Sequence, residues 1–252
     1  MRGRCAGIGE GSAEVKALLA LGLSLVTGLA AAQVGPSAAE ATHYTGLHAA
    51  AWRGDAAAVA VAVAVAVARA DRAAVDTRDG HGRTPLHVAT FARQPEVIRT
   101  LAKAGADLGA FENDRYDAVT IAAVADDEAT LAVLLELGAS AGLTTSRYDG
   151  TALIAAAHLG HDGVVRQLIK AGAPLDHVNN LHWTALIEAV VLGDGGTRHQ
   201  RVVHDLLTAG ANAQLTDREG RTPLALARSR GYAAMVRQFE MARDAGAAVR
   251  PR

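Results

Sequence analysis

The sequence predicts an all-α solenoid built from about six repeats of a helix-turn-helix unit. A residue able to cap a helix recurs at intervals of 39, 33, 34, 33 and 38 residues. It falls at Thr45, Thr84, Asp117, Thr151, Thr184 and Thr222. A second pattern, Leu-x-x-x-Gly-Ala, returns with the same period at residues 101–106, 134–139, 168–173 and 206–211. One unit of this size cannot bury its own apolar faces, so the copies are expected to stack.

The clearest unit runs from residue 150 to residue 176. Thr151 is a good cap for the first helix, because its hydroxyl accepts from free N–H groups of the first turn. Gly160 and Gly172 are expected to end the two helices, since glycine adopts the left-handed conformation without penalty. Asp162 is expected to cap the second helix. That helix carries one apolar stripe at helical period, made of Val164, Val165, Leu168 and Ile169.

The repeat with the most informative sequence contains Thr84-Pro-Leu-His-Val-Ala followed by Gly105-Ala-Asp. With these motifs the chain resembles the ankyrin repeat family from residue 45 to residue 239. The resemblance implies an ankyrin-repeat solenoid of L-shaped repeats with short β-hairpin-like fingers. It also implies a surface for binding other proteins.

The first and last repeats depart from the common pattern. Residues 56–70 alternate Ala and Val like a strand, yet their place between a Gly-Asp turn and the next repeat favours a helix. This run is apolar on every side, so we expect it to be buried or paired. Arg72 stands where the other repeats have glycine. In the last repeat, residues 222–239, arginines suit a soluble cap, and residues 240–252 are expected to form a flexible tail.

The first 32 residues have the composition of a secretory signal peptide. Basic residues precede an apolar run from Ala17 to Ala32, which ends in a small-residue cleavage pattern. The alternative interpretation is a buried first helix of the solenoid. Residues 33–44 are then expected to form a linker, and the mature protein is expected in the periplasm. Cleavage there would remove Cys5, the single cysteine.

The charge balance gives no reason to expect a nucleic acid or a membrane surface as partner. The chain has 25 Lys and Arg against 26 Asp and Glu, a net charge of −1. We expect no cofactor, no bound metal and no catalysis. His158 and His161 have the spacing of a ligand pair, but His161 falls in the Gly-His turn of the repeat. His48 and His87 are expected to hydrogen-bond the capping threonine and nearby backbone.

The least generic stretch is residues 179–199, which includes a five-residue insertion within 193–199. Glu188, Asp194 and His199 are the residue types of an acid/base set, but glycines flank Asp194, so we expect that loop to be too mobile for catalysis unless other contacts order it. Aromatic and arginine side chains often anchor interfaces, and the predicted fingers carry several. The candidate partner-binding residues are Arg115, Tyr116, Arg147, Tyr148, Asn180, His182, Trp183, Glu188, Asp194 and His199. The alternatives are that the aromatic residues pack finger against finger and that the insertion is only a solvated loop.

Residues 179–199 and the recurring Arg-Tyr-Asp of residues 115–117 and 147–149 resemble a bacterial subgroup of ankyrin proteins that carry signal peptides. Some members of that subgroup are associated with catalase and with protection against peroxide. The resemblance therefore implies a non-catalytic, monomeric protein-binding scaffold in the periplasm that supports oxidative-stress defence. Two alternatives remain, a small-ligand or metal-binding protein and a secreted effector directed at a host.

Overall fold

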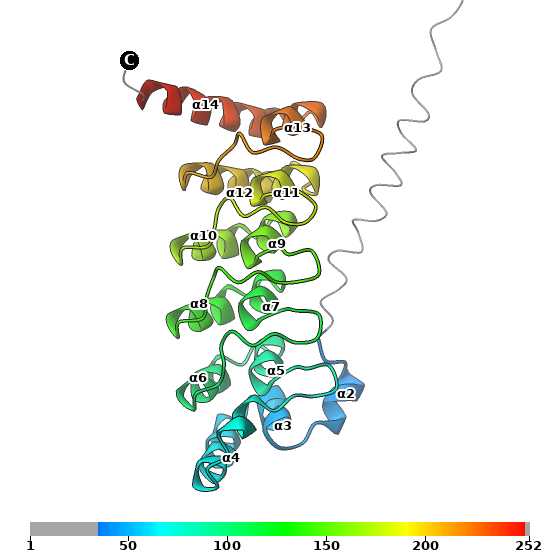
Figure 1. Cartoon of the computed structure of the whole chain (residues 1–252), viewed down its shortest axis with the longest axis vertical. Helices are drawn as coiled ribbons and strands as arrows, with labels where there is room; N and C mark the ends of the chain where they lie inside the picture. Colours follow the sequence, from blue (N-terminus) through cyan, green and yellow to red (C-terminus); the bar gives the residue numbers. More distant parts are fainter. Residues whose placement is uncertain (1–34, 250–252) are drawn as a thin grey trace, which may run out of the picture. The chain divides into compact units, whose positions relative to one another are not determined.

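The computed structural model describes residues 35–249, which form a single row of stacked helix pairs (Figure 1). The segment predicted to be a signal peptide lies outside the described residues. Helices α5, α7, α9, α11 and α13 form one column, and α6, α8, α10, α12 and α14 form the second (Figure 1). Each repeat is joined to the next by a loop that extends past the ends of the first column. Within residues 35–249, no helix is both long and apolar enough to span a bilayer.

The helix bounds follow the predicted repeats. The N-terminal elements are α2 (Ala38–His43), α3 (Gly46–Arg53), α4 (Ala56–Ala68) and the 3₁₀ helix η2 (Arg72–Asp76). The next three repeats are α5 (Pro85–Phe91) with α6 (Pro95–Lys103), α7 (Ala118–Val124) with α8 (Glu128–Glu136), and α9 (Ala152–Leu159) with α10 (Asp162–Lys170). The last two are α11 (Ala185–Val191) with α12 (Thr197–Thr208), and α13 (Pro223–Ser229) with α14 (Ala233–Val249).

Capping side chains set where the first helix of each repeat begins. From the second repeat onward the recurrent residue lies at the N-cap, and its side chain accepts from a backbone N–H of the first turn. Thr45 occupies the same place without such a bond. Gly160 ends α9 at φ 71°, in the left-handed region. The cap predicted for Asp162 is wrong: His161 is the N-cap, and Asp162 lies in the first turn of α10, where its carboxylate binds arginines instead.

A continuous apolar core runs through the stack. Leu86, Leu153 and Leu186 of the first column are buried, as are Leu134 and Leu168 of the second. Each repeat therefore buries its apolar faces against its neighbours, as the short units require. The described residues form no strand, and the isolated bridge between Thr145 and Gly150 is their only β-type pairing.

The Ala-Val run is the helix α4, as predicted, but the stack buries only part of it, and the alternative that it is paired stays a prediction. Val59 is fully buried, whereas Val61, Val65 and Val67 are 66%, 45% and 66% exposed. The physical reason is position: α4 belongs to the first repeat, so the stack covers it from one side only. Its second half borders an open groove of about 900 Å³ shared with α6 and Gly105.

The segments predicted to be a linker and a flexible tail both contain helix. The predicted linker, residues 33–44, contains α2, because Ser37 and Glu40 form a reciprocal capping box that starts a helix there. The predicted tail, residues 240–252, begins as helix, because α14 continues to Val249. Buried Met235 and Phe239 hold the start of α14 on the stack, and Glu240 pairs with Arg228 of α13 at 2.6 Å.

Candidate functional site

The loops between repeats form compact turns, here called fingers 1 to 5: residues 79–83, 112–116, 145–150, 179–183 and 217–221. In fingers 1, 2, 4 and 5 the first residue donates its N–H to the carbonyl of the fifth at 3.0 Å. The side chain of that first residue accepts from the N–H groups of the third and fifth residues. The first position therefore requires an acceptor, which explains Asp79, Glu112, Asn179 and Asp217. The fourth position has a positive φ in each of these fingers.

Neighbouring fingers are also bonded to each other through their backbones. Asn113 donates its N–H to the carbonyl of His81 at 3.0 Å, Ser146 to Arg115 at 2.9 Å, and Asn180 to Tyr148 at 3.0 Å. These three bonds tie fingers 1 to 4 into one row. A partner that docks along this row meets a surface that is already ordered, which lowers the entropic cost of binding.

Most of the predicted finger residues lie at the surface. Arg115, Arg147, Asn180 and His182 are exposed, and Tyr148 and Trp183 are half-buried. Several already have partners: Arg115 pairs with Asp149 at 3.0 Å, and Asn180 Nδ2 donates to the Arg147 carbonyl at 2.9 Å. The Arg147 guanidinium lies 5.7 Å from the centre of the Tyr148 ring.

The prediction is wrong for Tyr116, which is 8% exposed and belongs to the core. Tyr116 and Trp183 both occupy the fifth position of a finger, where Tyr116 is buried and Trp183 is half-buried. Trp183 accordingly packs in part against the core. Tyr148 is not in this register, because Gly150 occupies the equivalent position. Tyr116 and Trp183 therefore pack on the core, and the three aromatic residues do not form the predicted exposed row.

Glu188 lies in a buried polar network and not at the surface, so its prediction as a contact residue is wrong. It is 3% exposed and accepts from Asn179 Nδ2 at 2.9 Å. Its other oxygen lies 3.3 Å from His158 Nδ1. Because Asn179 also shapes finger 4, Glu188 connects the helices of two repeats to the base of that finger.

The insertion is held by contacts to neighbouring repeats, which is the condition under which the expected mobility of this loop does not apply. His199 Nδ1 lies 2.9 Å from Asp194 Oδ1, and His199 Nε2 lies 2.9 Å from the His158 carbonyl oxygen. The imidazole fills a slot between Gly160 and Gly193, where an added Cβ would meet the ring at 2.8 Å and 2.6 Å.

The glycines at the end of the insertion are covered by the last repeat. Tyr232 of that repeat lies over Gly195 and donates its hydroxyl to the Gly193 carbonyl at 2.9 Å. Asp194 remains exposed at the tip, but its carboxylate is engaged by His199 and by the N–H of Gly196.

The structure does not join Glu188, Asp194 and His199 into an acid/base set. His199 contacts Asp194 with one ring nitrogen and a backbone carbonyl with the other. The ionisable partner of Glu188 is the His158 side chain. The three residues instead belong to one structural chain of contacts that runs from the insertion to finger 4.

Sequence reasoning missed a charged cluster around Asp162. This buried carboxylate binds Arg166, Arg198 and Arg201, each at 3.1 Å. Burial raises the pKa of Asp162, but hydrogen bonds from Arg166 and Arg198 outweigh it and lower the pKa overall. Arg198 also reaches Asp126 at 2.8 Å, so one side chain spans three repeats. The insertion makes this possible because it lets α12 begin early enough to carry Arg198.

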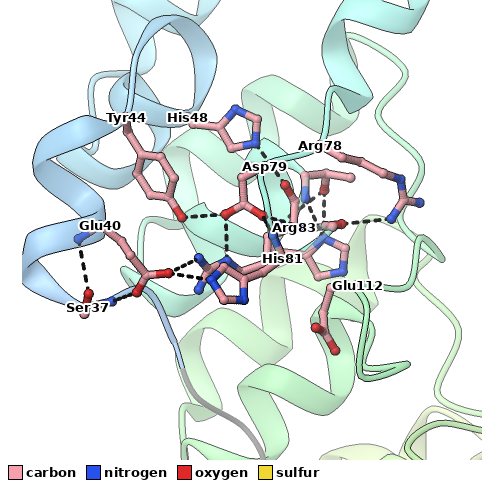
Figure 2. Close-up of polar contacts among 12 residues, drawn as sticks. Ser37, Glu40, Tyr44, His48, Arg78, Asp79, His81, Arg83 and Glu112 are labelled. Atoms are coloured by element: carbon pink, nitrogen blue, oxygen red, sulfur yellow. Dashed lines mark hydrogen bonds and ion pairs between the residues drawn. The ribbon is translucent and has the colours of Figure 1, made fainter.

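A second missed cluster joins α2 to finger 1 (Figure 2). Glu40 Oε1 lies 2.9 Å from Arg83 Nη2 and 2.8 Å from His81 Nε2. Tyr44 donates its hydroxyl to Asp79 Oδ2 at 2.8 Å, and Arg83 Nε contacts the same oxygen at 2.7 Å. The Ser-x-x-Glu capping pattern was the signal that sequence reasoning had available here.

The two carboxyls of this cluster stay ionised to low pH. Hydrogen bonds from the backbone and side chain of Ser37, then from Arg83, lower the pKa of Glu40 to about 2. Burial raises the pKa of Asp79, but bonds from Tyr44 and Arg83 outweigh it and bring the value to about 2.

Comparison with known proteins agrees with this architecture. A family model described as ankyrin repeats (3 copies) matches residues 12–112 and 119–207. The chain belongs to the ankyrin repeat family. The putative ankyrin repeat protein YahD of Escherichia coli K12 is 34% identical over 159 residues, which cover 63% of this chain and 79% of YahD. The B-cell lymphoma 3 protein homolog of Mus musculus is 30% identical over 167 residues, 65% of this chain but only 36% of that protein.

Solved ankyrin structures superpose on most of the stack. The ankyrin repeat domain ABAYE2397 of Acinetobacter baumannii AYE has a TM-score of 0.69 at 40% identity and covers 78% of this chain and 96% of its own. Ankyrin repeats are generally non-catalytic scaffolds for protein–protein interaction, and this chain carries such a domain. Among residues 35–249, no group of three or more His, Cys, Asp or Glu side chains is arranged to hold a metal ion.

Proposed function

We propose that this ankyrin protein is a non-catalytic, monomeric scaffold that binds a protein partner along its finger row. The observation that carries the proposal is the row itself, in which backbone bonds link fingers 1 to 4 while Arg115, Arg147, Asn180 and His182 stay exposed. Arginine and aromatic side chains on an ordered surface are the usual anchors of an interface.

The test is capture of the partner by the chain that begins at Gln33, followed by loss of that capture in a finger variant. Arg147→Glu combined with His182→Ala changes two exposed positions of the row. We expect this double variant to raise the dissociation constant for the captured protein by about tenfold or more, which is the range of a hot-spot residue. Lys170→Glu, at an exposed position on α10 of the second column, is the control and should bind as the wild type does. Equal affinity of all three chains would remove the finger row from the function.

We further propose that the protein acts in the bacterial periplasm. The support is the secretory pattern of residues 1–32 and the similarity to bacterial ankyrin proteins. Cell fractionation tests it directly: the mature chain should appear with periplasmic markers and should begin near Gln33. Recovery with cytoplasmic markers, or in the culture medium, would refute the location.

A role in oxidative-stress defence is proposed only through the resemblance of residues 179–199 to the catalase-associated subgroup. A deletion strain should then survive peroxide less well than its parent. The wild-type gene should restore survival, and the Arg147→Glu, His182→Ala variant should not. Equal survival of the deletion strain and its parent would refute the role in peroxide defence and would leave the binding proposal intact.

A further inference from the structure

We propose that finger 1 is a docking site for an acidic helical segment of the partner, and that the chain's own helix α2 fills this site until the partner displaces it. The inference rests on the proposed function, since it assigns one finger of the same row a ligand chemistry. Figure 2 shows the arrangement: Glu40 and Tyr44 approach finger 1 from a separate element and end on His81, Arg83 and Asp79.

The contact between α2 and finger 1 is polar. Helix α2 has six residues, none of them buried. The side chains that hold it are Glu40, which reaches Arg83 and His81, and Tyr44, which donates to Asp79. A helix this short is not stable alone in water. Its order therefore depends on these bonds, on the Ser37 capping box and on the packing of Pro36 and Tyr44 at its two ends. A competing ligand displaces it by replacing the polar bonds to finger 1.

Finger 5 shows what finger 1 would be without a ligand. Both fingers have Asp at the first position and Arg at the fifth, and in both the Arg Nε donates to the Asp Oδ2, at 2.7 Å and 2.8 Å. In finger 5 the second carboxylate on Arg221 comes from Glu219 of the same finger, at 3.1 Å, and the Arg221 side chain is 54% exposed. In finger 1 the second carboxylate comes from outside the finger, and the Arg83 side chain is 4% exposed.

The groups around Arg83 define the ligand. The Arg83 guanidinium already donates to Asp79 through Nε. Without Glu40, Arg83 Nη2 and the neighbouring His81 Nε2 would lose their carboxylate acceptor. A carboxylate restores both contacts. The position of the carboxylate within the ligand helix is also defined. One oxygen of Glu40 accepts from the Ser37 N–H at 2.7 Å, while the other faces Arg83. The ligand is therefore a helix start with glutamate in its first turn and a hydroxyl donor four residues later, as in Ser37-x-x-Glu40-x-x-x-Tyr44.

The test uses a synthetic peptide of residues 33–46 as the probe and the full chain as receptor. In the wild type the tethered α2 competes, and tethering gives it a large effective concentration. In the Glu40→Gln, Tyr44→Phe variant the cis ligand is weakened. We expect the peptide to bind this variant at least about tenfold more tightly than the wild type, an effect on the scale of lost tethering.

Two controls fix the site. Adding Arg83→Gln to the variant should abolish peptide binding, whereas adding Arg221→Gln, the equivalent change in finger 5, should not alter it. A peptide with its own glutamate changed to glutamine should bind none of the chains, which keeps the test valid even if the Arg83 variant unfolds. No binding to the Glu40→Gln, Tyr44→Phe chain, or binding that survives Arg83→Gln in a folded chain, overturns the proposal. Either result leaves the Arg147 and His182 test of the proposed function unaffected.

Discussion

At the scale of single residues, His87 shows how the fold controls the charge of a buried side chain. Its Nδ1 lies 2.8 Å from Thr84 Oγ1, and its Nε2 lies 3.2 Å from the Tyr116 carbonyl oxygen. These contacts match the structural role predicted from the sequence. Burial lowers the pKa of the imidazole to about 4, while hydrogen bonds to backbone carbonyls act the other way.

The lowered pKa of His87 makes stability depend on pH. Between pH 6.5 and pH 4 the unfolded chain binds a proton that the folded chain does not, so the stabilisation is complete above about pH 6.5 and is lost as the pH falls. We expect the free energy of unfolding to drop by about 2 kcal/mol between pH 7 and pH 5 from this residue. Urea denaturation at both pH values measures it, with His87→Gln as comparison. An identical drop in that variant would assign the effect to other groups.

Glu188 is a residue whose role the sequence did not reveal. The other repeats have Ala, Val, Ile or Leu at the equivalent helix position, which is buried in most of them, yet Glu188 was predicted to contact a partner. The structure instead satisfies it with Asn179 and His158. We expect Glu188→Ala to lower the free energy of unfolding by about 1–3 kcal/mol, because it leaves buried polar partners unpaired. Glu188→Gln should cost less, and a chemical denaturation series compares the two. Equal stability of all three chains would contradict the network.

At the scale of elements, the sequence predicted what depends on local chemistry. The recurrent caps from Thr84 onward and the glycine stop at Gly160 follow from neighbours in the chain. The helical state of residues 56–68 follows from their place in the repeat and not from their local pattern. Contacts between repeats were not predictable in this way. Tyr116 packs in the core and not at the surface. The helix in the predicted linker is stabilised by Arg83, 43 residues further on, which donates to Glu40.

The contact between His199 of the insertion and Gly160 of the preceding repeat gives a test of packing between repeats. Gly160→Ala should destabilise the protein more than Gly172→Ala, although both glycines have a positive φ, 71° and 80°. An added Cβ at residue 172 has no neighbour within 4 Å, so only the penalty of about 1–2 kcal/mol for a left-handed backbone applies. At residue 160 it also meets the His199 ring, which adds about 1–3 kcal/mol of overpacking.

A double-mutant cycle decides whether His199 is the cause of that difference. Thermal unfolding of Gly160→Ala, His199→Ala and the double variant gives the coupling between the two sites. If His199 fills the slot, the double variant should be more stable than the sum of the single effects. Additive effects would show that the insertion does not pack on α9 as described.

At the scale of the whole molecule, the two ends of the stack differ in charge. The last helix, α14, carries Arg237, Glu240, Arg243 and Asp244. The outer helix of the first repeat, α4, has no charged residue in its 13 positions. A terminal repeat normally needs a polar outer face to stay soluble. The N-terminal end should therefore be the part of the molecule through which heated or concentrated samples aggregate.

This asymmetry leads to a prediction that separates solubility from folding. Val61 and Val65 are one helical turn apart on α4 and are both exposed, whereas Val59 is fully buried in the stack. Changing Val61 and Val65 to Lys should raise the temperature at which light scattering begins, with the unfolding midpoint by circular dichroism nearly unchanged. Val59→Lys should instead lower that midpoint strongly, since it buries an unpaired charge. A fall in the midpoint of the Val61, Val65 variant would mean that this face of α4 is covered in solution by something that the isolated stack does not contain.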